Sequence, residues 1–217
     1  MNLLILGANG KIAQIIEQRI LSEQKFEDIQ LTLFLRNPSR LNHLEGNSRM
    51  TLMEGDLSDE VAVSKAMTGQ DMVFIATVDI DPSNTITKNV IQAMEAQQVK
   101  RVLAASSIGI YGEEPNSQFH DWNQSSLNSA LKPMRQAAEL LQTSGLNYTV
   151  LRFAWLNDRN TVDYEITKKG EKFVGGSGSR QSMADATLKI IANPQLYTNE
   201  IIGIADPSTK DAPSVVY

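Results

Sequence analysis

Residues 3–20 read LLILGANGKIAQIIEQRI, and the parts of this segment follow one another in an informative order. Leu3–Leu6 has the length and apolar composition of a buried strand, and Gly7-Ala8-Asn9-Gly10 forms a turn. After the turn, isoleucines recur at the spacing of one helix face, at Ile12, Ile15, Ile16 and Ile20. The segment therefore predicts a strand, a glycine-rich turn and a helix in immediate succession.

The glycine-rich turn has the chemistry of a diphosphate site. Glycine allows a sharp turn and a close approach of backbone to an anion, and the start of the helix offers N–H groups and the positive end of its dipole. We expect the cofactor-binding residues here to be Gly7, Asn9, Gly10, Lys11 and Ile12. A phosphate-binding P-loop is excluded because Ile5 and Ile12 occupy positions that need glycine and Ser or Thr. The alternative is a tight turn that binds nothing.

The rest of the chain alternates short apolar strands with amphipathic helices, which is typical of a parallel sheet. Further strands are expected at residues 31–35, 50–53, 72–75, 101–105, 148–151 and 201–204. Residues 106–125 are expected to form a polar loop, and residues 155–179 an irregular segment. The fold class is therefore α/β, a doubly wound parallel sheet with helices on both faces. We expect residues 1–217 to form a single domain, with a small substrate-side segment around residues 153–181.

Composition narrows the possible functions. The net charge of −5 argues against non-specific binding to nucleic acid or to anionic membranes. The absence of cysteine excludes disulfides, thiolate catalysis and thiolate metal sites, and the histidines His43 and His120 lack the spacing of a metal site. No apolar stretch approaches the ~20 residues that span a bilayer, and the first residues do not resemble a signal peptide, so a cytoplasmic location is expected.

Two arginines bear on the choice of cofactor. Arg36 follows the second strand, where an NAD-binding protein usually carries Asp or Glu for the ribose 2′-hydroxyl. An arginine there can bind a 2′-phosphate through charge-assisted hydrogen bonds, and Arg40 can add a second contact across Asn37-Pro38-Ser39. We therefore favour NADP over NAD. The alternative is a pair of solvated surface arginines.

At this point the sequence resembles the atypical short-chain dehydrogenases/reductases, of the NmrA-like or NAD(P)-binding epimerase/reductase branch, across nearly its whole length. The resemblance rests on Gly7-x-x-Gly10-x-x-Ala13, Arg36, Gly55-Asp56, Ser106-Ser107-x-x-x-Tyr111-Gly112 and Ser144-Gly145-Leu146-x-Tyr148-Thr149-x-Leu151-Arg152. It implies a Rossmann fold. It also implies Asp56 and Leu57 beside the adenine, Ala76 and Thr77 beside the ribose and diphosphate, Ser106 as a cofactor-binding residue, Ser107 as the active-site serine, and Phe153 at the nicotinamide.

One part of the family pattern is missing. Members with a full catalytic set carry Tyr-x-x-x-Lys on the helix after the fifth strand, where the lysine lowers the pKa of the tyrosine. The matching positions here are Leu131 and Arg135, and Pro133 is expected to disturb the segment between them. Carbonyl chemistry that needs a tuned tyrosine and sugar-nucleotide epimerisation are therefore disfavoured. Hydride transfer remains possible because the cofactor supplies that chemistry.

Other side chains are weaker site candidates. Ser107 and Tyr111 are the candidate catalytic residues, although Tyr111 also fits a half-buried loop aromatic. Arg135 can hold the cofactor or lie on a solvated helix face, and His120 beside Asp121 is not expected to act as an acid–base pair. Trp155 and Tyr164 are candidates for the wall of a substrate pocket, or they pack the extra segment.

Two functions fit these features. The first is an NADPH-dependent oxidoreductase that transfers hydride to a small quinone- or flavin-like acceptor. The second is a non-catalytic NADP(H)-sensing regulator of the NmrA-like kind, which acts through a protein partner. The missing dyad favours the second, and the aromatic residues Trp155 and Tyr164 favour the first. The oligomeric state is not predicted by the sequence.

Overall fold

The computed structural model describes residues 1–44 and 46–217, apart from the side chain of His43. The described residues form one eight-stranded sheet in the order β3-β2-β1-β4-β5-β6-β10-β8. These strands are β1 (Asn2–Leu6), β2 (Gln30–Leu35), β3 (Met50–Glu54), β4 (Met72–Ile75), β5 (Arg101–Ser107), β6 (Asn147–Phe153), β8 (Glu165–Lys168) and β10 (Glu200–Ala205). All neighbours pair in parallel except β8, which is antiparallel to β10. The strand order reverses between β1 and β4, so this is a Rossmann-type fold.

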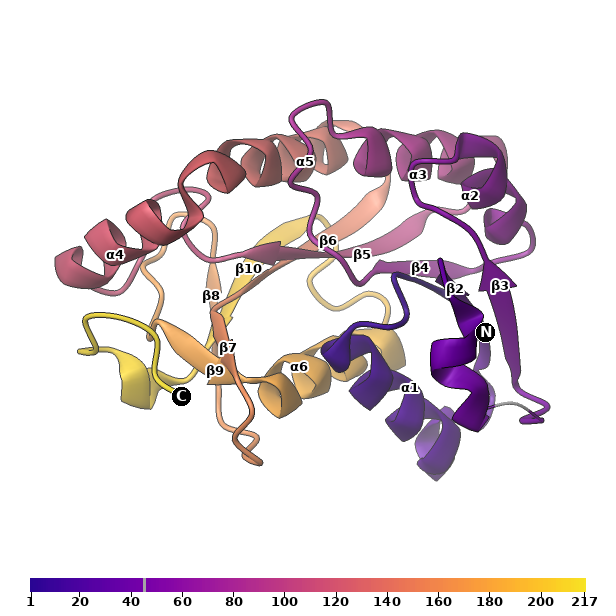
Figure 1. Ribbon diagram of the computed structural model, residues 1–217, viewed down its shortest axis with the longest axis horizontal. Coiled ribbons are helices and arrows are strands. Elements are labelled where there is room, and N and C mark those ends of the chain that lie inside the picture. Colours follow the sequence, from indigo (N-terminus) through magenta and orange to yellow (C-terminus); the bar gives the residue numbers. More distant parts are fainter. Residues whose placement is uncertain (45) are drawn as a thin grey trace.

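Helices cover both faces of the sheet (Figure 1). On one face α1 (Lys11–Ser22) packs against α6 (Arg180–Ala192). On the other face lie α2 (Glu60–Met67), α3 (Thr85–Ala96) and α5 (Leu131–Thr143). In the part of the chain that the structure describes, four short 3-10 helices connect the elements: η1 (Gln24–Phe26), η2 (Pro38–Leu44), η3 (Asn128–Ala130) and η4 (Pro207–Thr209). The expected doubly wound α/β fold with helices on both faces is confirmed.

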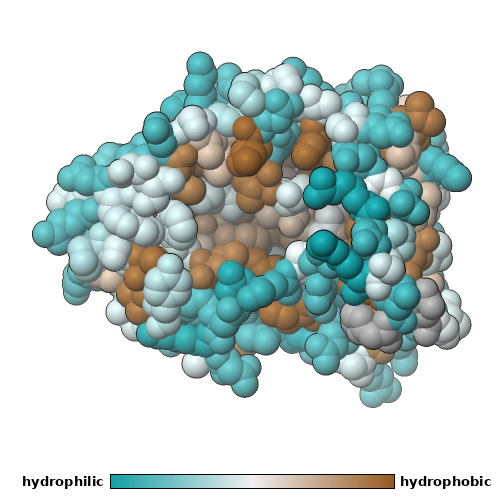
Figure 2. All heavy atoms as spheres, in the orientation of Figure 1, coloured by the Kyte–Doolittle hydropathy of each residue, from teal (hydrophilic) through white to brown (hydrophobic). Residues whose placement is uncertain are grey.

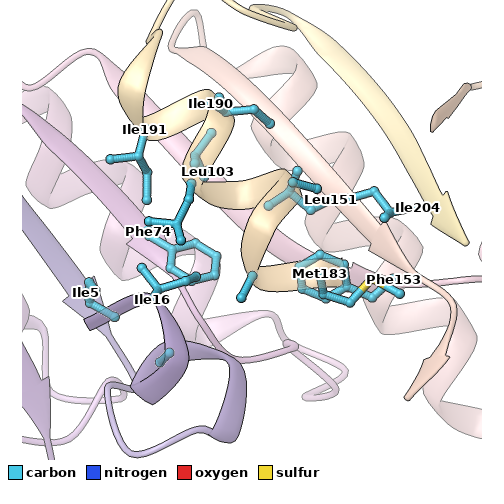
Figure 3. Packing of buried hydrophobic residues seen from close by; sticks show 14 of the residues in the cluster. Ile5, Ile16, Phe74, Leu103, Leu151, Phe153, Met183, Ile190, Ile191 and Ile204 are labelled. Atoms are coloured by element: carbon cyan, nitrogen blue, oxygen red, sulfur yellow. The ribbon is translucent and has the colours of Figure 1, made fainter. Parts of the chain in front are cut away.

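Two hydrophobic clusters hold these layers together, one on each face of the sheet. In the first, residues of β1, β4, β5, β6 and β10 meet side chains of α1 and α6, among them Ile16, Met183 and Ile190 (Figure 3). The strands are buried on both faces and so read as continuous apolar runs. Ala13, 1% exposed, brings α1 close to the sheet just behind the glycine turn.

Two segments that were expected to be irregular contain regular structure. The expected loop at residues 106–125 is wrong in its second half, where α4 (Ser117–Leu127) begins with the Asn116 side chain accepting a hydrogen bond from Phe119 N at 2.8 Å. The expected irregular segment at residues 155–179 contains β8 and the strands β7 (Trp155–Asn157) and β9 (Ser177–Ser179), which pair in parallel. These strands have only three or four residues, too few for a visible alternation of side chains.

Pro133 does not disturb its helix as expected. It is the third residue of α5, and the first turn of a helix has no intrahelical partner for its N–H groups. The Pro133 carbonyl accepts a hydrogen bond from the Asn84 side chain at 2.9 Å, which ties α5 to the start of α3. In the described part of the chain, no helix is both long and apolar enough to cross a membrane.

Candidate functional site

The turn between β1 and α1 is built for close approach by an anion. Gly7 has φ +82°, a conformation that favours glycine, and the N–H groups of Gly7 and Ala8 donate to Phe34 O at 3.0 and 3.2 Å. Gly10 is the N-cap of α1 and therefore supplies no side-chain cap. The first N–H groups of α1 thus lack the side-chain acceptor that usually satisfies them, and an anion can take its place.

A cavity of about 530 Å³ opens in front of this turn. Its volume lies within the range of small-molecule and cofactor sites. The carboxyl ends of β1, β2 and β4, the segment after β3 and the first turn of α3 supply its lining. Many of the predicted cofactor residues meet there: Gly7, Asn9, Gly10, Arg36, Arg40, Asp56, Leu57, Ala76 and Thr77. Figure 2 shows a hollow with a hydrophobic floor in this side of the molecule, between the two helical layers.

Sequence reasoning did not list five further lining residues, Phe34, Leu35, Asn37, Gly55 and Ile86. Phe34, Leu35 and Asn37 flank Arg36, so the end of the second strand was a usable signal for them. Gly55 precedes Asp56, and the Phe34 ring occupies the space that a Cβ at Gly55 would need. Ile86 comes from α3, and no local pattern links that helix to the turn.

The charged groups of the cavity are two arginines and one carboxylate. Asn37 Oδ1 accepts from Ser39 N and Ser39 Oγ at 3.2 and 2.6 Å, and this turn carries Arg36 and Arg40. Two hydrogen bonds from Ser58 and, to a smaller extent, the charge of Arg36 lower the pKa of Asp56. Arg36 and Arg40 are exposed, and among the described residues neither guanidinium has a hydrogen-bond or ion-pair partner.

Two of the predicted serines lie further along the same edge of the sheet. Ser106 and Thr77 line a small crevice of about 20 Å³ that continues from the cavity toward α5. The Ser106 hydroxyl is buried and has no partner among the described residues. Ser107 ends β5 opposite Phe153 of β6 and is partly exposed. Ser107 thus lies at the carboxyl edge of the sheet, and its catalytic role stays a prediction.

Tyr111 and Arg135 form a group of their own. The Arg135 guanidinium lies 5.3 Å and the Lys169 ammonium 4.4 Å from the centre of the Tyr111 ring, and Arg135 Nε pairs with Glu139 at 2.8 Å. Burial raises the pKa of Tyr111, which makes its phenol a weaker acid. This shift is opposite to the one a catalytic tyrosine needs. Leu131, at the tyrosine position of the family motif, is buried in the core.

Besides Ser106 and Arg135, three further predicted cofactor residues do not line the cavity. Lys11 pairs with Asp158 at 3.2 Å, and both side chains are exposed. Ile12 packs against the core, and Phe153 is buried within it. Lys11 follows the lining residue Gly10, Ile12 comes one residue later, and Phe153 pairs with Ser107 in the sheet, so their contacts with a cofactor stay predictions.

The two aromatic residues predicted to form a pocket wall lie apart. Trp155 packs against Trp122 of α4, whereas Tyr164 donates to Asp185 at 2.9 Å, receives a hydrogen bond from Lys189 and lines a separate cavity beside α6. His120 contacts Glu114, with Nδ1 and Oε2 2.9 Å apart, and not Asp121, as expected. No group of metal-ligating side chains occurs among the described residues.

These features fit a dinucleotide with a 2′-phosphate. The turn and the start of α1 suit the diphosphate, and Asp56 and Leu57 border the space available for an adenine. Arg36 and Arg40, whose guanidinium groups have no hydrogen-bond or ion-pair partner among the described residues, supply positive charge at the end of the cavity where a ribose 2′-phosphate would lie.

Comparison with known proteins gives a consistent result. A family model described as NAD(P)H-binding matches residues 7–194. A Rossmann-fold NAD(P)-binding protein from Shigella flexneri is 36% identical with a TM-score of 0.81, over all of this chain and 98% of that one. A short-chain dehydrogenase/reductase from Veillonella parvula, solved in complex with NADP, is 27% identical with a TM-score of 0.91, over all of this chain and 99% of that one.

Two curated proteins are similar over part of their length. Cinnamoyl-CoA reductase 1 of Petunia hybrida is 35% identical over 126 residues, which are 52% of this chain and 37% of that protein. Quinone oxidoreductase 2 of Escherichia coli is 23% identical over 190 residues, 84% of this chain and 58% of that protein. The chain thus spans less than two thirds of the length of these relatives.

Proposed function

This chain belongs to the NAD(P)H-binding family and has the fold of the short-chain dehydrogenases/reductases, and on that premise we propose that it is an NADPH-dependent reductase of a flat, quinone- or flavin-like acceptor. The observation that supports the cofactor choice is the cavity at the glycine turn with Arg36 and Arg40 at its margin. The Escherichia coli relative named as a quinone oxidoreductase supports the acceptor class.

The chain's own residues mainly bind and orient in this reaction. The glycine turn and the start of α1 hold the diphosphate, and the arginines neutralise the 2′-phosphate. When bound, NADPH supplies a hydride, and a quinone that receives it needs one further proton, which water can provide. No Tyr-x-x-x-Lys pair is needed for this reaction, and the helix after β5, where the family carries it, has none. The same spacing occurs at Tyr164 and Lys168, but these residues lie at β8, where Tyr164 contacts Asp185 and Lys168 pairs with Glu200.

The proposal is tested by NADPH oxidation with naphthoquinone and flavin acceptors, together with calorimetric titration of NADPH. The variant Gly10→Arg is expected to abolish binding, because the backbone at Gly10 tolerates a side chain and the arginine would project over the turn. Val61→Arg, which adds the same charge at a site 78% exposed on α2, is the matched control and is expected to bind NADPH normally.

The outcomes separate the two candidate functions. Binding with turnover supports the reductase. Tight NADPH binding without oxidation by any flat acceptor supports instead the non-catalytic NADP(H) sensor that the missing dyad favours. If neither NADPH nor NADH binds at millimolar concentration, both proposals are wrong.

A further inference from the structure

Both tryptophans of the chain, Trp122 and Trp155, lie against each other. Their ring centres are 4.8 Å apart at an interplanar angle of 56°, and Phe119 packs edge-on against Trp122 at 5.3 Å. Trp122 and Phe119 come from α4, and Trp155 comes from β7. Phe119 is fully buried, whereas both indoles are partly exposed. We call Phe119, Trp122 and Trp155 the aromatic wall.

The Trp155 indole is held by a chain of buried polar groups. Its Nε1 donates to Asn123 Oδ1 at 2.7 Å, and Asn123 Nδ2 donates to Glu114 Oε1 at 2.9 Å. Asn123 and Glu114 are both buried. Asn123 accepts through one atom and donates through another, so its two bonds fix the orientation of the amide and, through it, the plane of the indole.

Glu114 is a carboxylate in this arrangement. Burial raises its pKa, but hydrogen bonds from His120, Asn123 and Gln124 outweigh burial, so that the pKa of Glu114 lies below its usual range. The backbone at Gly109 lies close to the Asn123 amide. Gly109 has φ +92°, and a Cβ there would collide with the Asn123 amide. The loop after β5 thus lies directly against α4.

The aromatic wall lies where the far end of a bound dinucleotide is expected. Trp155 is the second residue after the end of β6, and in doubly wound sheets ligands bind outside the carboxyl ends of the strands. In the proposed binding mode, the cavity at β1 to β4 takes the adenine, the 2′-phosphate and the diphosphate, since it is lined by the glycine turn, Arg36, Arg40 and Asp56. The nicotinamide half must then extend past Gly10 toward the ends of β5 and β6, next to Trp155.

We propose that the aromatic wall binds a planar aromatic acceptor beside the nicotinamide, and that Asn123 is a positioning residue that orients Trp155 for this contact. The proposal rests on the reductase function, and it assigns the selection of flat acceptors to the aromatic wall. A flat ring gains stacking energy against an ordered indole, whereas an aliphatic carbonyl compound does not. The wall therefore favours quinones and flavins over small aliphatic ketones.

Intrinsic fluorescence tests the wall without requiring turnover, because every tryptophan of the chain belongs to it. With NADP⁺ bound, menadione is expected to quench the emission saturably in the wild type and in Trp122→Phe, which leaves only Trp155. Tyr164→Phe, an aromatic change beside α6, is the matched control, and menadione is expected to quench its emission as it quenches that of the wild type. Normal NADP⁺ binding without saturable quenching would overturn the wall and leave the cofactor site intact.

Kinetics test the positioning role. Trp155→Leu is expected to raise KM for menadione about tenfold, the value of one good aromatic contact, with KM for NADPH and the rate with diacetyl unchanged. Asn123→Leu is expected to give the same pattern. The double variant Glu114→Gln with Asn123→Asp keeps the total charge and the acceptor for Trp155 Nε1, but it reverses the hydrogen bond between positions 114 and 123. It is expected to bring KM for menadione most of the way back to the wild-type value. Equal losses with menadione and diacetyl, or a double variant no better than Asn123→Leu, would show that Asn123 serves only to hold the fold.

Discussion

At the scale of single residues, Arg36 carries the cofactor preference. It is exposed at the end of β2, where the turn stabilised by Asn37 and Ser39 presents it to the cavity that Asp56 also lines. A carboxylate at this position would accept from a ribose hydroxyl and repel a phosphate. A guanidinium does the reverse, because it donates to the phosphate in a planar, bidentate geometry.

Arg36→Ala is expected to weaken NADPH binding about 10- to 100-fold and to leave NADH binding within about twofold, because charge-assisted hydrogen bonds contribute roughly 1.5–3 kcal/mol. Calorimetric titration of both dinucleotides measures the ratio. Arg135→Ala removes another exposed arginine, one that pairs with Glu139 beside Tyr111, and it should change neither affinity. An equal loss for NADPH and NADH in Arg36→Ala would show that Arg36 does not read the 2′-phosphate.

The residues that sequence reasoning placed in the site are those tied to a local motif. Gly7, Gly10, Arg36 and Asp56 each follow a strand in a recognisable pattern, and all of them line the cavity. Ile86 reaches the cavity only through the packing of α3, which no spacing in the sequence encodes. The contact between Trp122 and Trp155 likewise joins elements that lie far apart in the chain.

At the scale of elements, strongly apolar segments were predicted well and polar ones poorly. The strands β1, β4 and β5 are continuous apolar runs because they are buried on both faces. Helix α4 reads SQFHDWNQSSL, with few apolar residues, so its periodicity is weak. Its N-cap, Asn116, was a usable signal, because its side chain accepts a hydrogen bond from the backbone N–H of Phe119, the third residue of the helix.

Helix α5 shows why position within an element matters more than residue type. Pro133→Ala is expected to lower the free energy of unfolding by no more than about 1.5 kcal/mol, the contribution of the buried methylenes removed. Gln136→Pro, only one turn further along, is expected to cost about 3 kcal/mol or more, because it removes an intrahelical hydrogen bond and clashes with the preceding turn. Urea denaturation of both variants gives the comparison. Similar losses in the two would mean that Pro133 does not belong to the first turn.

At the scale of the whole molecule, the layer formed by α1 and α6 contains an unusual buried acid. Glu17 of α1 is fully buried, and neither carboxylate oxygen has a partner among the described residues. Burial raises the pKa of Glu17 to about 8. At neutral pH the Glu17 side chain is therefore mostly protonated. Its ionised form would be a buried charge without a partner, and it would destabilise the packing of α1 in this layer.

This acid makes the stability of the whole fold depend on pH. Between the ordinary pKa near 4.5 and the raised value near 8, Glu17 has lost its proton in the unfolded chain but retains it in the folded one. Unfolding then releases a proton, so the free energy of unfolding falls as pH rises, by roughly 1.4 kcal/mol per pH unit from this group. Below the lower value both states are protonated, and the contribution is constant.

Glu17→Gln is expected to remove this slope, because the amide carries no charge at any pH, and so to stabilise the protein most at pH 8. Urea denaturation between pH 5 and pH 8 measures the free energy of unfolding of the wild type and the variant. Glu95→Gln, on the exposed surface of α3, is the matched control and should follow the wild type. If the wild-type and Glu17→Gln curves run parallel over this range, Glu17 is ionised in the folded protein, and a cation or water must reach it between the helices.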